Sequence, residues 1–150
     1  EANIDIDDFE NGLVGLISDE PNIAYLEEIL HLVTQVGYAN AYPEVFGEFK
    51  GSMISSAMDV ARGGYFEKVP KIYPESSWYH YYDKSCDYAC MITEYFYWSL
   101  TSLLGAQINR YEEISDEWEL NTPNKMTKDK LIMGLLQDKK YKIPNRLPLF

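Results

Sequence analysis

The chain has 150 residues, 46% of them hydrophobic, which is enough for one globular domain with its own core. Twenty-four acidic residues stand against 13 basic ones, giving a net charge of −11. This charge has the wrong sign for binding a phosphate backbone, so the composition argues against nucleic acid as a partner. No repeat, low-complexity tract or Pro/Gly-rich linker divides the sequence. We therefore expect a single domain over residues 1–150.

Residues 1–20 are acidic, with aspartates alternating with isoleucines from Ile4 to Asp7, which fits a short strand or an arm. No signal peptide is visible, and the chain begins at Glu1 without a methionine. We expect the C-terminal part of a larger processed protein, with an upstream segment or a second chain completing the fold.

The first strong helical pattern covers residues 22–36 and is followed by Gly37, which we expect to end the helix. Glu27 and His31 are four residues apart and share one helix face, with Glu28 beside them. The opposite face carries an apolar stripe, which we expect to face the core: Leu26, Ile29, Leu30, Val33 and Val36.

The remaining pattern predicts a mainly α fold in which residues 22–36 and 87–107 are two central packed helices. Ser52 and the Gly63–Gly64 pair delimit a helix over 52–62. Residues 65–84 read as loop with one or two short strands, which leaves an α+β fold open. Further expected elements are helices near 110–120 and 127–137 and an extended C-terminal strap over 141–150.

Glu94 is the only charged residue between Tyr88 and Asn109, in a segment that is apolar on all faces and should be central. Six polar residues interrupt this segment, so we expect a buried helix and no membrane span. An unpaired buried carboxylate costs several kcal/mol or more. Glu94 must therefore be protonated, paired with a base such as Arg62, Arg110 or His31, or bound to a cation.

Two cysteines, Cys86 and Cys90, are separated by four positions at the expected start of the long helix. They either close a small disulfide or remain as two buried thiols, because a bridge this short has strict geometry. We predict the disulfide, which implies an oxidising compartment and a secreted, extracellular protein.

Residues 78–82 gather one tryptophan, three tyrosines and the second histidine, His80. Tyr and Trp dominate interface hot spots, so this cluster is a candidate contact for a protein partner. Core packing is an equally good interpretation. His80 remains a reserve metal ligand.

Two short motifs, Glu27-Glu28-Ile29-Leu30-His31 and Thr93-Glu94-Tyr95-Phe96, resemble those of the glutamate-zincins, zinc metallopeptidases whose third ligand is a glutamate on a separate downstream helix. Residues 26–48 and 78–107 also look like a group of uncharacterised secreted proteins of marine organisms. The first resemblance implies that Glu27, His31 and Glu94 hold zinc or another divalent cation, with a peptide or protein as substrate. Glu28 would be the catalytic general base that takes a proton from the bound water.

Glu27 departs from the family pattern, which has histidine as the first ligand of H-E-x-x-H. Two carboxylates neutralise the charge of the ion and weaken it as a Lewis acid. A second departure is the absence of an N-terminal sheet to hold a substrate. Two hypotheses follow: a metallopeptidase-like hydrolase or its degenerate, inactive relative, and a non-catalytic secreted binding or structural protein with a tyrosine-rich partner surface.

Overall fold

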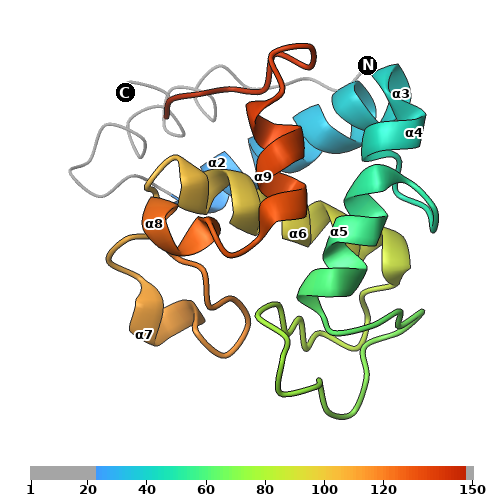
Figure 1. The fold of residues 1–150 in the computed structure, drawn as a ribbon, viewed down its shortest axis with the longest axis vertical. Coiled ribbons are helices and arrows are strands. Elements are labelled where there is room, and N and C mark those ends of the chain that lie inside the picture. The colour runs from blue at the N-terminus through green and yellow to red at the C-terminus, as the bar shows by residue number, and fades with distance from the viewer. Residues whose placement is uncertain (1–22, 148–150) are drawn as a thin grey trace, which may run out of the picture.

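The computed structural model describes residues 23–147 (Figure 1), so the strand or arm expected in residues 1–20 and the last three residues of the strap lie outside them. Within this range the chain is mainly helical, with no strand and no sheet, which confirms the predicted fold class. Two isolated bridges, Lys68–Asp87 and Tyr79–Trp118, replace the short strands expected in 65–84. The elements are α2 (Ile23–Leu32), the π-helix η1 (Val33–Tyr38), α3 (Ala39–Ala41), α4 (Pro43–Phe46), α5 (Met53–Ala61), α6 (Tyr88–Leu103), α7 (Tyr111–Ile114), α8 (Pro123–Met126) and α9 (Lys130–Gln137).

The long helix α6 crosses the centre of Figure 1, and α2, η1, α5 and α8 all contact it. Asp87 caps its first turn by accepting a hydrogen bond from the backbone N–H of Cys90 at 2.9 Å. Buried side chains occupy every face of the helix. It ends four residues before the expected boundary because Gly105 adopts a φ of +86°, a left-handed conformation that glycine tolerates.

Helix α2 packs along α6 as predicted, but one expectation about it is wrong and another holds only in part. Gly37 does not end it, because the chain continues through η1 into α3. The apolar stripe faces the core only in part: Leu30 packs against it, whereas Ile29 is 53% exposed and Val36 is 62% exposed. Only one face of α2 meets α6, and that face carries Glu27, His31 and the buried Thr34 at spacings of four and three.

Helix α5 forms where the sequence predicts it, with Ser52 accepting a hydrogen bond from Ser55 N–H at 3.1 Å. Arg62 follows the helix and is completely buried. Its guanidinium donates to the Asp59 carboxylate at 2.7 Å and to the Phe66 carbonyl at 3.1 Å. Burial of this charge is tolerated because these acceptors replace water.

The helix expected over 110–120 is reduced to the single turn α7. Trp118 is completely buried, and its indole donates to Ser102 Oγ at 2.9 Å. The backbone around it pairs with the aromatic segment instead of with itself: His80 N–H donates to the Glu117 carbonyl, and Glu119 N–H donates to the Trp78 carbonyl. A continued helix would use these backbone groups internally and could not bury the tryptophan in this way.

Helix α9 forms within the predicted helix 127–137 and is capped by Asp129, which is 2% exposed. Its carboxylate accepts hydrogen bonds from the Trp78 indole at 3.0 Å and the Tyr95 hydroxyl at 2.6 Å. Residues 141–147 contain no helix, as expected for a strap, and bury the side chains of Tyr141 and Ile143.

The sulfur atoms of Cys86 and Cys90 lie at disulfide distance, with Cα atoms 5.4 Å apart, which confirms the predicted pairing. In the part of the chain that the structure describes, no helix combines the length and the apolar character needed to cross a membrane.

Candidate metal centre

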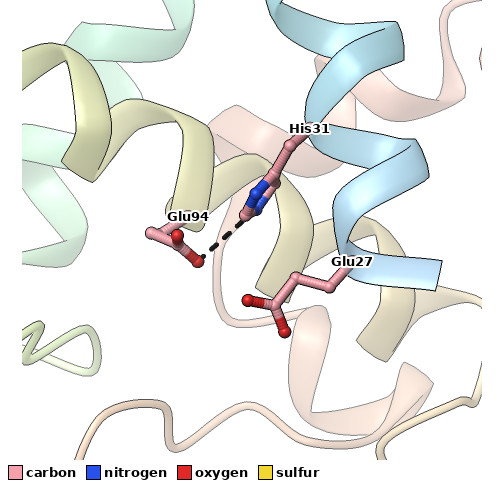
Figure 2. Close-up of side chains that lie close together, drawn as sticks. All are labelled: Glu27, His31 and Glu94. Atoms are coloured by element: carbon pink, nitrogen blue, oxygen red, sulfur yellow. Dashed lines mark ion pairs between the residues drawn. The ribbon is translucent and has the colours of Figure 1, made fainter. Parts of the chain in front are cut away.

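Three predicted ligands meet between α2 and α6. Figure 2 shows the carboxylates of Glu27 and Glu94 and the imidazole of His31 directed toward a common space. Each residue offers one ligand atom, and these atoms all lie within 4.8 Å of one another. His31 Nε2 and Glu94 Oε2 are 3.5 Å apart. Glu94 therefore lies beside His31, one of the three bases considered from the sequence.

The Nε2 atom of His31 is buried but has no hydrogen-bond partner. Its separation from Glu94 is an ion-pair distance, and the geometry does not make a hydrogen bond. The ring packs edge-on against Tyr97, with centroids 5.8 Å apart, which holds the imidazole between the helices. Leaving a buried polar atom unpaired costs about 1–3 kcal/mol, so a ligand that occupies this atom would stabilise the site.

Electrostatics couple the three groups. Burial raises the pKa of Glu27, and the neighbouring Glu94 carboxylate raises it further against the opposing effect of His31. Burial by itself would lower the pKa of His31, but the carboxylates of Glu94, Glu27 and Glu28 outweigh burial and raise it. The metal-free site therefore holds protons more strongly than isolated side chains would. A divalent cation would replace those protons.

Hydrogen bonds between polar side chains next to the site link α6 to neighbouring segments of the chain. The Thr93 hydroxyl, next to Glu94 in sequence, donates to the carboxylate of Glu48 and accepts a hydrogen bond from Gln35 Nε2 at 3.2 Å. Gln35 belongs to η1, so these bonds fix the register between the helix that carries His31 and the helix that carries Glu94. A π-helical turn beside a polar site is a common feature of functional sites.

A cleft of about 620 Å³ adjoins two of the three ligands. Glu27 and Glu94 lie in its wall, so an ion held by them would have an open side facing the cleft. The other lining residues are Tyr81, Tyr82, Trp98, Arg110, Glu113, Ile114, Asp116 and Glu117. The wall is thus rich in carboxylates and aromatic rings.

Glu28, the predicted general base, is exposed on α2 and is not among the residues that line this cleft. Its carboxylate is near enough to raise the pKa values of Glu27 and His31. His80 is not part of the three-residue group and lies 4.0 Å from Glu119.

The aromatic segment divides between two environments. Trp78 and Tyr79 are buried in the core, which supports the packing interpretation for them. Tyr81 and Tyr82 reach the cleft wall, and Tyr82 is 65% exposed. Only this outer pair remains a candidate for partner contact.

Glu117 is the cleft residue that sequence reasoning missed. It is mostly buried, and its Oε1 accepts a hydrogen bond from the indole of Trp98 at 2.6 Å. The one available signal was that Trp98 is four residues after Glu94 and so shares its helix face. Nothing in the local sequence indicates that residue 117 meets this face.

No family model matches the chain, and neither the curated proteins nor the solved structures contain a significant match.

Proposed function

We propose that this chain is a zincin-like metal-binding domain in which Glu27, His31 and Glu94 hold one divalent cation, with zinc as the preferred ion. The observation that carries the proposal is the convergence of three ligand atoms from two helices around a buried imidazole nitrogen that has no other partner. Exposed acidic clusters lack such a nitrogen.

The geometry supports a tetrahedral ion. Zinc bonds to His nitrogen and carboxylate oxygen at about 2.0–2.2 Å, which in a tetrahedron separates neighbouring ligand atoms by roughly 3.3–3.6 Å. His31 Nε2 and Glu94 Oε2 are already 3.5 Å apart. The flexible side chain of Glu27, on the same helix as His31, can close the remaining distance by rotation. Calcium would need six to eight oxygen ligands, and an imidazole nitrogen does not suit it.

Three protein ligands with an open fourth position are typical of a catalytic zinc ion, whereas structural zinc ions have four protein ligands. The cleft beside Glu27 and Glu94 supplies space for a water molecule and a substrate. We therefore propose a metallopeptidase-like hydrolase, with peptide hydrolysis suggested by the resemblance of the two ligand motifs to those of the glutamate-zincins. The disulfide supports a secreted, extracellular setting for this activity.

An inactive, metal-binding relative is the second candidate, and Glu27 favours it. Two anionic ligands reduce the ability of the ion to acidify water and polarise a carbonyl. Metal binding would be retained while hydrolysis is lost, leaving the tyrosines at the cleft as a partner surface.

The decisive experiment is a zinc titration of the metal-free protein, purified without a polyhistidine tag, in competition with a chromophoric chelator. We expect one zinc per chain and a loss of affinity of more than about 100-fold in Glu27→Gln and His31→Gln. The matched controls are Glu28→Gln, which changes the adjacent glutamate, and His80→Gln, which changes the other histidine. Equal losses in the controls would contradict the proposed ligand set.

A further inference from the structure

A mostly buried carboxylate other than the one that the motif indicates lines the cleft beside the proposed ion. Glu28 follows Glu27 in the sequence, but its side chain is exposed and does not line the cleft. Glu117 comes from the segment after α7 and shares the cleft wall with the ligands Glu27 and Glu94. A group that exchanges a proton with a water molecule in the cleft must reach that cleft.

Backbone contacts on both sides hold Glu117 in place. Its N–H donates to the Ile114 carbonyl at 3.0 Å, and its own carbonyl accepts from His80 N–H at 2.7 Å. The next residue, Trp118, is anchored in the core through its bond to Ser102. The backbone at position 117 is therefore held rigidly, as the position of an acid–base group requires.

The side chain is oriented by the helix that carries Glu94. Trp98 lies one turn after Glu94 on α6, and its indole N–H donates to Oε1 of Glu117 at 2.6 Å. This bond brings the Glu117 carboxylate to the face of α6 from which Glu94 projects. Among residues 23–147, no donor bonds to the other oxygen, Oε2, which leaves it able to accept a hydrogen bond from water.

We infer that Glu117, and not Glu28, is the proton acceptor of this site; the inference rests on the proposed function, in which Glu27, His31 and Glu94 hold the cation. A water molecule in the cleft gives one proton to Oε2 of Glu117. The electron pair of the broken O–H bond stays on the water oxygen, which becomes hydroxide, and Glu117 becomes a neutral acid. No oxidant or reductant takes part.

The environment of Glu117 suits this exchange. Burial raises the pKa of Glu117 to about 7, against the opposing hydrogen bond from Trp98 and with added repulsion from Glu94 and Glu27. A bound cation would offset the repulsion but not the burial, which is the largest cause. The other charged groups of the cleft are Asp116 and the Arg110–Glu113 pair, and Tyr81 and Tyr82 also line it.

Cobalt(II) is the probe, because its visible absorption bands report the ligands of the ion and the ionisation of water in the site. The protein is loaded with one cobalt ion and titrated from about pH 5 to 9. In Glu117→Gln, cobalt affinity should change less than threefold. The midpoint of the spectral transition should fall by about one pH unit or more, because the negative carboxylate that opposes hydroxide formation is gone. Gln keeps a carbonyl that can accept the Trp98 bond.

Glu28→Gln and Glu113→Gln are the matched controls: the first removes the motif glutamate, and the second removes a cleft carboxylate whose side chain is 64% exposed. Both should move the midpoint much less than Glu117→Gln does, although the charge of Glu28 contributes weakly to the electrostatics of the site. A normal transition in Glu117→Gln, or an equal shift in Glu28→Gln, would overturn the inference while leaving the metal site intact. Failure of the unsubstituted protein to bind cobalt would overturn the proposed function as well.

If Glu117→Gln does not fold, Glu117→Asp is the second variant, because it withdraws the carboxylate by one methylene. The midpoint of its spectral transition should move in the same direction. An unchanged midpoint would overturn the inference.

Discussion

The imidazole of His31 and the carboxylate of Glu94 face each other across the α2–α6 interface at 3.5 Å, and the buried Nε2 atom has no hydrogen-bond partner. Folding thus places a carboxylate beside an imidazole without completing the hydrogen bonding of either group. A proton on His31 or a shared cation would complete the arrangement. The first two predictions follow from these two ways of completing it.

Zinc should stabilise the folded protein, because it binds the assembled site and the unfolded chain lacks that site. At a free zinc concentration 100 times the dissociation constant, the gain is about 2.7 kcal/mol. Thermal unfolding with zinc and with a chelator measures this gain. Glu94→Gln should keep the fold but lose most of the stabilisation by zinc. Glu28→Gln should retain that stabilisation. An equal zinc effect in Glu94→Gln would contradict the site.

The metal-free protein should lose stability as the pH rises from about 4.5 to above 7. The pKa values of Glu27, Glu117 and His31 are all raised in the folded state. A raised pKa contributes stability that is complete below the unfolded pKa and is lost as the pH rises through the folded one. For Glu117, whose pKa rises from 4.5 to about 7, this contribution is at most roughly 3 kcal/mol.

Urea unfolding of the metal-free protein at a series of pH values measures how the free energy of unfolding falls as the pH rises. In Glu117→Gln the decline between about pH 4.5 and 7 should be smaller, leaving the part that belongs to Glu27 and the decline above about 6.5 that belongs to His31. A free energy of unfolding that rises with pH over this range would have the wrong sign for these three groups.

Asp129→Ala should destabilise the fold by about 2–4 kcal/mol. The substitution removes the acceptor of the Trp78 and Tyr95 hydrogen bonds and the N-cap of α9 together. Asp138→Ala is the control, because Asp138 is exposed and accepts only a local bond from Lys140 N–H. Chemical denaturation should separate the two variants clearly, and equal midpoints would argue against the buried cluster.

The Cys86–Cys90 disulfide should leave no free thiol when the unreduced protein is denatured and titrated. Replacing both cysteines with serine should lower the free energy of unfolding by about 2 kcal/mol, as expected for so short a loop. Two thiols per chain in the titration would refute the bridge and remove the support for an extracellular setting.

The sequence predicted the helices near 22–36, 52–62 and 87–107 because each combines apolar periodicity with a recognisable boundary. It failed for 110–120, where burial of Trp118 outweighs local helix preference. It also placed the apolar stripe of α2 wholly in the core, whereas Leu30 packs there, Ile29 and Val36 are exposed, and the face with Glu27 and His31 meets α6.

The ligand group could be predicted from two local facts: the spacing of Glu27 and His31, and the cost of burying Glu94 in an apolar helix. Glu117 could not be predicted in this way. Its position depends on a bridge between Tyr79 and Trp118 and on the indole of Trp98, contacts between segments far apart in the sequence. No periodicity or motif encodes such long-range contacts.

X-ray diffraction from crystals of the zinc-loaded protein, measured on both sides of the zinc absorption edge, tests the central claim most directly. We predict one anomalous peak per chain, about 2.0–2.2 Å from His31 Nε2 and from one carboxylate oxygen each of Glu27 and Glu94. A peak at another site, such as His80 and Glu119, with none between α2 and α6 would contradict the account.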